Sequence, residues 1–395
     1  MEWVKLGDCF EFIRNGANIK QFGSGGLPIT RIETISDRTI NKNKVGYANI
    51  NYPEYSDYYL KYDDILMSHI NSESHLGKVA IYKDKTDEVL IHGMNLLCLR
   101  SKNGFLADYL YYFFNSFVFK NQLNKIIKKS VNQASFNITN LKKLKVPYLS
   151  ISKQKNIVDK LSKLETLIQT RQDQIQALDD LIESAFYNSF GDYISNKENT
   201  VDLKEITSHI SSGSTPKGGS KVYLSEGTPL IRSQDVLMNK LDLSNVAYIS
   251  EETHNSMKRS KLKNKDILLN ITGASIGRTA VFNGEDDSAN TNQHVASIRL
   301  NTKEFLPEFI SYYFSTDYFQ SVIKNICSGG TREALNYTQI GMFKIPNVDV
   351  EKQNQFAAFV EKIEKQKQIL NDSLGDLTNL FDSLMQDAFD GSMTR

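Results

Sequence analysis

The side chains that could support catalysis lie close together in the first half of the chain. His69 and His75 are near three serines, Ser68, Ser72 and Ser74, and a serine nucleophile needs such a histidine as its base. The stretch has no Gly-x-Ser-x-Gly turn, which exposes the nucleophile in one large class of hydrolases. The six histidines of the chain show no metal-ligand spacing. We therefore expect these residues to be non-catalytic.

Motifs for chemistry on DNA or nucleotides are incomplete as well. A DNA-adenine methyltransferase needs an Asn/Asp-Pro-Pro-Tyr/Phe pocket for the flipped base, whereas residues 51–55 contain only one proline. The sequence has no Gly-x4-Gly-Lys-Ser/Thr loop to hold phosphates. Of the acidic pairs that a nuclease could use, Asp63-Asp64 precedes a strand-like segment as a turn would, and Glu361-Lys362 falls on the exposed side of a predicted helix. The sequence predicts no catalytic residue and no metal site.

Basic residues are distributed in a way that the net charge of +1 conceals. Residues 116–150 contain seven lysines and no acid, and residues 258–265, Lys-Arg-Ser-Lys-Leu-Lys-Asn-Lys, are likewise free of acids. Each run alone is typical of a solvated face. Two runs, one in each half of the chain, favour contact with the phosphates of a nucleic acid.

Length and composition indicate a multi-domain globular protein. The 395 residues are 40% apolar and 24% charged, which suits two sizeable domains plus connecting elements. Cys9, Cys98 and Cys327 lie far apart, which argues against a disulfide framework or a zinc cluster and fits a reducing compartment. The sequence has no run of eighteen apolar residues, and its N-terminus lacks the layout of a signal peptide. We expect a cytoplasmic protein.

The chain repeats itself once. Residues 105–114 (FLADYLYYFF) match residues 305–314 (FLPEFISYYF). Shorter landmarks match in the same order: 27–31 with 228–232, 64–66 with 266–268, 77–81 with 277–281, 136–137 with 335–336, and 146–147 with 345–346. Between them, residues 36–58 and 237–259 share almost nothing. A duplicated scaffold with two different surfaces suggests recognition of two different targets, and drift of surface loops is the alternative.

Each half ends in a stretch whose apolar residues alternate in steps of four and three. The predicted seams are Ile157, Leu161, Leu164, Ile168, Arg171, Ile175, Leu178, Ile182 and Ala185, and Phe356, Val360, Ile363, Lys367, Leu370, Leu374, Leu377, Phe381 and Leu384. One such stripe is equally typical of an ordinary core helix, but two favour a coiled coil. Each seam contains one cation, Arg171 or Lys367, a device that can fix register and partner at some cost in stability.

A whole globular segment separates the two predicted helices, so we expect them to pair antiparallel, with the globular segments at opposite ends. From residue 157 to residue 185 the helix would span about 42 Å at 1.5 Å per residue. One turn of B-DNA takes about 34–36 Å. The predicted helix pair therefore has the length of a spacer on DNA.

The globular segments combine short strands, loops rich in Gly, Asn and Ser, and a helical stretch rich in Phe and Tyr, which predicts a mixed α/β (α+β) fold. The predicted division is 1–150, first recognition domain; 151–192, central helical spacer; 193–348, second recognition domain; and 349–395, C-terminal helical spacer.

An ordered set of motifs in the second half resembles the specificity subunits of type I restriction-modification systems. The motifs are Gly213-Ser214-Thr215-Pro216, residues 227–232, Lys265-Asp266-Ile267-Leu268, Gly273-Ala274-Ser275-Ile276-Gly277, Asn292-Gln293, Gly329-Gly330-Thr331-Arg332, Ile345-Pro346 and Glu351-Lys352-Gln353. Individually they are weak, but the ordered set, followed by a heptad helix, is specific. The resemblance covers essentially the whole chain.

The resemblance implies a non-catalytic subunit that binds double-stranded DNA and two methyltransferase subunits, joined by endonuclease/translocase subunits for cleavage. S-adenosylmethionine, ATP and magnesium would belong to those partners. Each recognition domain would read one half of a split, asymmetric target, while the helices set the gap and dock the methyltransferases. Two alternatives remain: a coiled-coil scaffold that reads no DNA, and a DNA-modifying enzyme that acts alone.

The residues that we expect to contact DNA are cations, amides and hydroxyls in the predicted loops and strand ends, since arginine suits guanine and asparagine suits adenine. They are Thr30, Arg31, Ser68, His69, Asn71, Lys128 and Lys129 in the first domain, and Lys217, Arg232, Asn270, Thr272, Ser275, Thr331 and Arg332 in the second.

Overall fold

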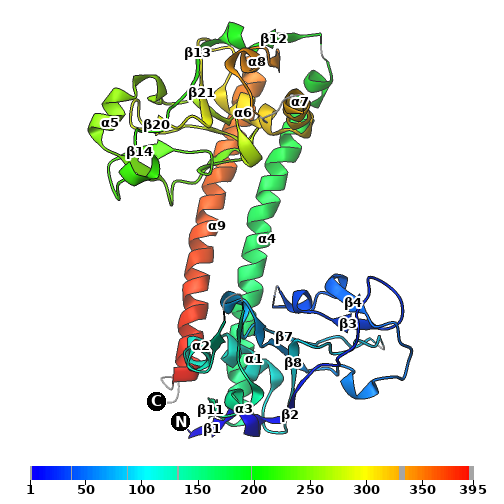
Figure 1. Ribbon diagram of the computed structural model, residues 1–395. Coiled ribbons are helices and arrows are strands. Elements are labelled where there is room, and N and C mark those ends of the chain that lie inside the picture. The colour runs from blue at the N-terminus through cyan, green and yellow to red at the C-terminus, as the bar shows by residue number, and fades with distance from the viewer. Residues whose placement is uncertain are drawn as a thin grey trace. The chain divides into compact units, whose positions relative to one another are not determined.

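The computed structural model describes residues 2–36, 38–86, 88–130, 133–196, 198–328 and 334–390. The chain forms two compact units, and many of their elements are labelled in Figure 1. Unit 1 comprises Met1–Asp173 and Asn371–Arg395, and unit 2 comprises Gln174–Leu370. Each unit contains one globular domain and one segment from each of two long helices, so the predicted mixed α/β fold is confirmed.

Unit 1 is built on a four-stranded antiparallel sheet in the order β2-β8-β5-β7. These strands are β2 (Phe10–Asn15), β5 (Ile65–Ser68), β7 (Val79–Ile81) and β8 (Leu96–Ser101). Smaller ladders join β1 (Glu2–Lys5) to β11 (Lys145–Tyr148) and β3 (Pro28–Thr30) to β4 (Val45–Tyr47). In a third, β10 (Ala134–Ser135) pairs with β6 (Ile70–Asn71) on one side and with β9 (Lys128–Lys129) on the other. The domain's helices are α1 (Ala107–Asn115), α2 (Phe117–Asn124) and α3 (Ile138–Leu141). The aromatic stretch predicted as helical is thus α1, and its Tyr109, Phe113 and Phe114 are core residues.

Unit 2 repeats this plan with its own four-stranded sheet, β13-β21-β18-β19. These strands are β13 (Thr207–Ser212), β18 (Ile267–Asn270), β19 (Thr279–Val281) and β21 (Val295–Leu300). Smaller ladders pair β12 (Thr200–Asp202) with β22 (Lys344–Pro346), β14 (Thr228–Ile231) with β17 (Ala247–Ile249) and β20 (Asn290–Thr291), and β15 (Val236–Leu237) with β16 (Lys240–Leu241). The domain's helices are α5 (Glu251–Ser256), α6 (Pro307–Ser315), α7 (Asp317–Cys327) and α8 (Tyr337–Gly341).

The two long helices are α4 (Ile151–Ser195) and α9 (Val350–Asp390). In unit 1 the first part of α4, with Ile157 and Leu161, shares a core with the last part of α9, with Ala388 and Phe389. In unit 2 the last part of α4, with Phe186, shares a core with the first part of α9. The helices therefore pair antiparallel, as predicted. Proline is absent from both, so no backbone N–H is lost from either ladder.

Two framework contacts occur once in each unit. A buried glutamine near the start of the long helix, Gln154 or Gln353, accepts from one backbone N–H and donates to two backbone carbonyls, at 2.8–2.9 Å. A buried aspartate at the start of a central strand makes two hydrogen bonds to an arginine: Asp64 to Arg100 in unit 1 and Asp266 to Arg299 in unit 2. The internal repeat therefore extends to individual hydrogen bonds.

None of the helices in the described ranges is long and apolar enough to cross a membrane.

Candidate nucleic-acid interface

Four of the predicted DNA-contacting residues of unit 1 come together on one small sheet. The strand order β6-β10-β9 places Asn71 and Lys129 on opposite sides of Ala134. His69 directly precedes β6, and its backbone carbonyl accepts from the N–H of Phe136 at 3.2 Å. Lys128 and Lys129 are exposed, and Lys129 forms an exposed ion pair of 2.8 Å with Glu73. This edge presents two cations and one amide, as phosphate and base contacts require.

An open groove of about 400 Å³ runs beside this sheet. Its lining residues include Asn15, His69, Lys128 and Phe136. His69 is only 7% exposed, and burial lowers the pKa of its imidazole while a hydrogen bond with the Asn95 backbone partly opposes this. Within the described ranges, its Nδ1 atom is buried without a hydrogen-bond partner. His69 thus lines the groove, and burial favours the neutral form of its imidazole.

The other predicted residues of unit 1 make their hydrogen bonds inside the protein. Thr30 is fully buried, and its Oγ1 accepts from the N–H of Gly93 at 2.9 Å. Ser68 is buried and donates to the backbone carbonyl of His75, not to its imidazole. Arg31 donates to Gln21 Oε1 at 2.8 Å and to the carbonyl of Phe22 at 3.1 Å. These side chains hold the loops in place, and no serine–histidine pair forms at residues 68–75 beyond a 3.5 Å contact of Ser74 with His75.

Two predicted residues of unit 2, Asn270 and Ser275, stabilise a hairpin. Asn270 is fully buried and donates to the carbonyl of Ser233 at 2.8 Å and to Ser275 Oγ at 3.2 Å. A third, Arg232, donates to both carboxylate oxygens of Asp235 at 3.2 Å and to the carbonyl of Asn245 at 2.8 Å. Since an arginine held in this way has few donors left for a base, Arg232 is placed as a framework residue of its loop.

A chain of four polar side chains links three separate loops of unit 2. Thr215 donates to Gln293 Oε1, Gln293 Nε2 lies 2.9 Å from His294 Nε2, and His294 Nδ1 lies 2.5 Å from Thr272 Oγ1. Of these four, the sequence indicated only Thr272 as a site residue, although Gln293 belongs to the Asn292-Gln293 motif. Lys217, two residues beyond Thr215, is exposed. The remaining predictions, Thr331 and Arg332, lie outside the described residues.

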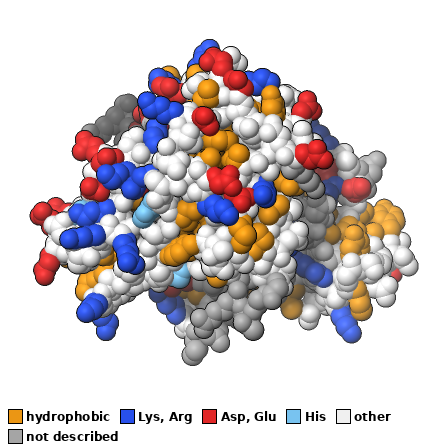
Figure 2. Space-filling model, turned by 90° about the horizontal axis from the view of Figure 1, so that it is seen from above, with side chains coloured by type: hydrophobic (Ala, Val, Ile, Leu, Met, Phe, Trp, Pro, Cys, Tyr) orange, Lys and Arg blue, Asp and Glu red, His pale blue; other side chains and the backbone are white. Residues whose placement is uncertain are grey.

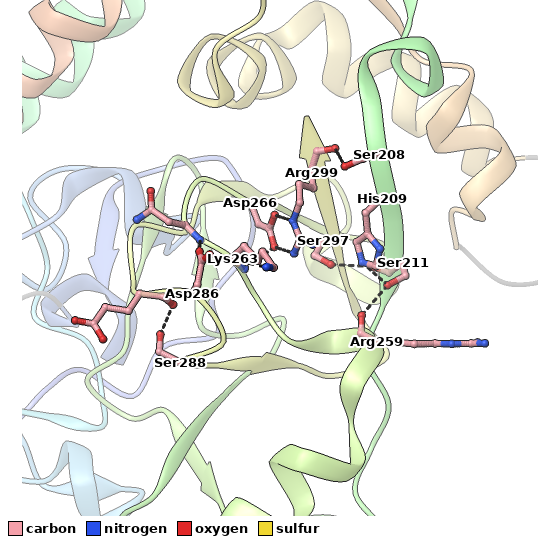
Figure 3. Close-up of polar contacts among 12 residues, drawn as sticks. Ser208, His209, Ser211, Arg259, Lys263, Asp266, Asp286, Ser288, Ser297 and Arg299 are labelled. Atoms are coloured by element: carbon pink, nitrogen blue, oxygen red, sulfur yellow. Dashed lines mark hydrogen bonds and ion pairs between the residues drawn. The ribbon is translucent and has the colours of Figure 1, made fainter. Parts of the chain in front are cut away.

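The second basic run, residues 258–265, borders strand β13. The carbonyl of Arg259 accepts from Ser211 Oγ at 3.1 Å, while its guanidinium extends away from the other labelled residues (Figure 3). Lys265 pairs with Glu308 at 2.6 Å, and Lys263 lies 3.9 Å from Asp286. Lys and Arg are mixed with Asp and Glu over the face in Figure 2, in keeping with the net charge of +1.

A serine–histidine pair does occur on β13, where Ser211 Oγ lies 2.9 Å from His209 Nε2 (Figure 3). Burial and the nearby Arg299 lower the pKa of His209. The neighbouring carboxylate, Asp266, accepts two hydrogen bonds from Arg299, at 2.7 and 2.6 Å, and one from the N–H of Lys263 at 2.8 Å. The pair therefore lacks the acid that orients the histidine in a hydrolase triad.

Comparison with known proteins gives one consistent result. The family profile of the type I restriction modification DNA specificity domain matches residues 1–179 and 196–378. The predicted MjaX specificity subunit of a type I restriction enzyme from Methanocaldococcus jannaschii is 33% identical, over 91% of this chain and 86% of that protein. The EcoBI specificity subunit from Escherichia coli is 31% identical over 43% of this chain and 36% of its own length.

The fold is also that of a solved specificity subunit. The crystal structure of a type I restriction-modification S subunit from M. genitalium superimposes with a TM-score of 0.59 at 15% identity, covering 98% of this chain and 96% of that one. A second structure, from a study of complex assembly in a type I system, gives the same TM-score over 98% and 97% of the two chains. With a family profile that matches both halves, the chain belongs to the type I restriction modification DNA specificity family.

Proposed function

We propose that the chain is the non-catalytic, DNA-reading subunit of a type I restriction-modification complex, and that each domain reads one half of a bipartite, asymmetric target. The α4–α9 pair would set the distance between the half-targets and dock two methyltransferase subunits. Endonuclease/translocase subunits would join for cleavage. S-adenosylmethionine, ATP and magnesium would be bound by these partners, and the assembly would act in the cytoplasm, where the DNA is.

The observation that carries this proposal is the contrast between shared framework and different surface. Both units use a buried aspartate–arginine pair and a buried glutamine in the same way. At the edge beyond the central strand, unit 1 has His69 and Asn71, while unit 2 has Thr272 bonded to His294. One scaffold with two side-chain sets suits two different base sequences.

We assign predicted contact residues a role in DNA binding from the exposure of their side chains. Lys128, Lys129 and Lys217 are exposed cations and would hold phosphates, which adds affinity without sequence preference. Asn71, Thr272 and Ser275, each partly exposed, would face the bases. Thr331 and Arg332 stay predicted DNA contacts of the second domain.

The test is to map methylated adenines across the genome in cells with the gene, without it, and with it restored. We expect a split motif that disappears with the gene and returns with it. An unchanged methylation pattern would argue for a scaffold that reads no DNA. Methylation or cleavage by the purified chain alone would show a stand-alone enzyme.

A further inference from the structure

Just beyond the central strands β5 and β18, where the predicted DNA-contacting residues lie, the two units differ at one pair of equivalent positions, His69 and Ile271. The backbone carbonyl of His69 accepts from the N–H of Phe136 at 3.2 Å, and that of Ile271 accepts from the N–H of Leu335 at 2.9 Å. Both side chains are at least nine-tenths buried. The same place in the fold thus holds a polar ring in unit 1 and an aliphatic side chain in unit 2.

The space beside this position differs in the same way. In unit 1 the groove passes between Asn15 and Ile138. The residues at these places in unit 2 are Ser212 and Tyr337, and the Tyr337 hydroxyl lies 3.0 Å from the N–H and 2.6 Å from the Oγ of Ser212. Tyrosine therefore bridges in unit 2 the gap that the shorter isoleucine leaves in unit 1.

In the part of the chain that the structure describes, the imidazole of His69 has a nitrogen with unused hydrogen-bonding capacity. A neutral imidazole has one donor nitrogen and one acceptor nitrogen. Nδ1 is buried without a hydrogen-bond partner among the described residues, and it is the acceptor in the tautomer whose proton is on Nε2. A buried acceptor without a partner carries a desolvation cost that a hydrogen-bond donor entering the groove would offset.

We infer that His69 is a specificity-determining residue of the first domain and that Nδ1 accepts a hydrogen bond from the exocyclic amino group of one DNA base, adenine N6 or cytosine N4. In the major groove these amino groups are donors, whereas guanine O6 and thymine O4 at the corresponding places are acceptors. Lys128, on the rim of the same groove, would hold a phosphate of the same strand.

This inference rests on the proposed DNA-reading function and adds a specific discrimination to it. Some base-pair changes at that position give the contacted strand the keto group and the other strand the amino group, such as adenine to guanine on the contacted strand. Nδ1 would then face a second acceptor. Such a pair should be rejected by the wild-type chain. Exchange of adenine for cytosine on the contacted strand would keep a donor available to Nδ1.

The experiment uses the complete methyltransferase complex with wild-type chain or with His69→Ile. Isoleucine is the residue that the fold already accommodates at position 271, so the variant keeps a natural occupant of this site. Thermal unfolding monitored by circular dichroism checks that it folds. Ile271→Val is the matched control in the second domain. The methylation motif of each complex is mapped across a genome.

We expect His69→Ile to relax a single position in one half of the motif, where it should now accept a pair with amino and keto groups exchanged between strands. The other half should stay unchanged, as should the whole motif of Ile271→Val. An unchanged motif in His69→Ile would overturn the inference, and so would relaxation confined to adenine–cytosine exchange on one strand. Absence of any split motif with the wild-type chain would instead refute the proposed function itself.

A second measurement remains informative if His69→Ile loses methylation. Duplexes in which purine replaces adenine, or 2-pyrimidinone replaces cytosine, remove one amino group at a time. Their binding is measured with the wild-type complex and with a His69→Phe complex, whose side chain is a ring without an acceptor nitrogen. We expect one position at which amino removal weakens wild-type binding roughly five- to 150-fold and weakens His69→Phe binding clearly less. Equal losses for both complexes at every position would contradict the assignment.

Discussion

Lys367 of α9 places its ammonium nitrogen 2.5 Å from the Oδ1 atom of Asp179 on α4. The same nitrogen lies 2.7 Å from Glu364. Burial by itself would lower the pKa of Lys367, but the two carboxylates outweigh it and the pKa is raised. Lys367 thus lies in the seam of unit 2 with its charge compensated, which is how a seam cation can specify register without a large loss of stability.

Reversal of this charge should destabilise the helix pair. Lys367→Glu places a third carboxylate beside Asp179 and Glu364, and we expect the free energy of unfolding to fall by about 1–3 kcal/mol. Lys367→Leu should change it by less than about 1 kcal/mol, because Asp179 is 48% exposed and regains water. Urea unfolding measures both variants. If Asp179→Lys failed to restore part of the loss caused by Lys367→Glu, the seam contact would not be the cause.

The buried glutamines should contribute to stability in both units. Gln353→Ala leaves the N–H of Leu306 and the carbonyls of Glu304 and Val348 without this partner, and we expect a loss of about 2–4 kcal/mol in the free energy of unfolding. Gln355→Ala, an exposed position on the same helix, is the control and should cost less than about 0.5 kcal/mol. Similar losses of unfolding free energy for the two variants would show that the hydrogen bonds of Gln353 do not stabilise the fold.

His92 should make stability depend on pH. Burial, with a smaller contribution from Arg14, lowers its pKa from 6.5 to about 4. Because the unfolded chain binds the proton more readily, the contribution of His92 is present above pH 6.5 and is lost as the pH falls from 6.5 towards 4. The loss amounts to at most about 3 kcal/mol.

Urea unfolding between pH 4 and pH 7 should therefore show a smaller slope of stability with pH for His92→Gln than for the wild-type chain. A shift of stability by the same amount at every pH, without a change of slope, would contradict the assignment.

The exposed lysines of the first domain should act through phosphates. Lys128→Ala should weaken DNA binding by the methyltransferase complex equally for target and non-target duplexes, because a phosphate contact carries no sequence information. The slope of log affinity against log salt should decrease by about 0.9 for each phosphate that the complex no longer neutralises. Lys5→Ala, exposed on β1, serves as control. A Lys128→Ala variant with relaxed specificity and an unchanged salt slope would assign Lys128 to a base instead.

The sequence was sufficient to predict the scaffold, because the patterns that specify it repeat at regular intervals along the chain. The step of four and three residues predicted both long helices, and the offset between halves predicted the duplicated domains. Residue-level roles were harder to predict because they depend on which side of a strand end faces the core. Ser68 and Asn270 occupy equivalent strand ends, and both are buried and bonded within their own hairpins.

The structural role of Arg232 could have been predicted from its neighbours in the sequence. Asp235 follows Arg232 by only three residues, so an ion pair within the same turn was a local possibility, and the two are paired. Gln293 belongs to the Asn292-Gln293 motif, whereas His294 had no local signal as a site residue, since only the folded turn before β21 brings it to Thr272.

The central claim is that the two domains read separate halves of one target, and the most direct measurement is a methylation map of variants confined to one domain. One complex would contain His69→Ile with Asn71→Ala, and another Thr272→Ala with Gln293→Ala. We predict that each pair alters one half of the motif, a different half in each case, and leaves the other half intact. Simultaneous change of both halves by either pair, or change of the same half by both, would contradict the account.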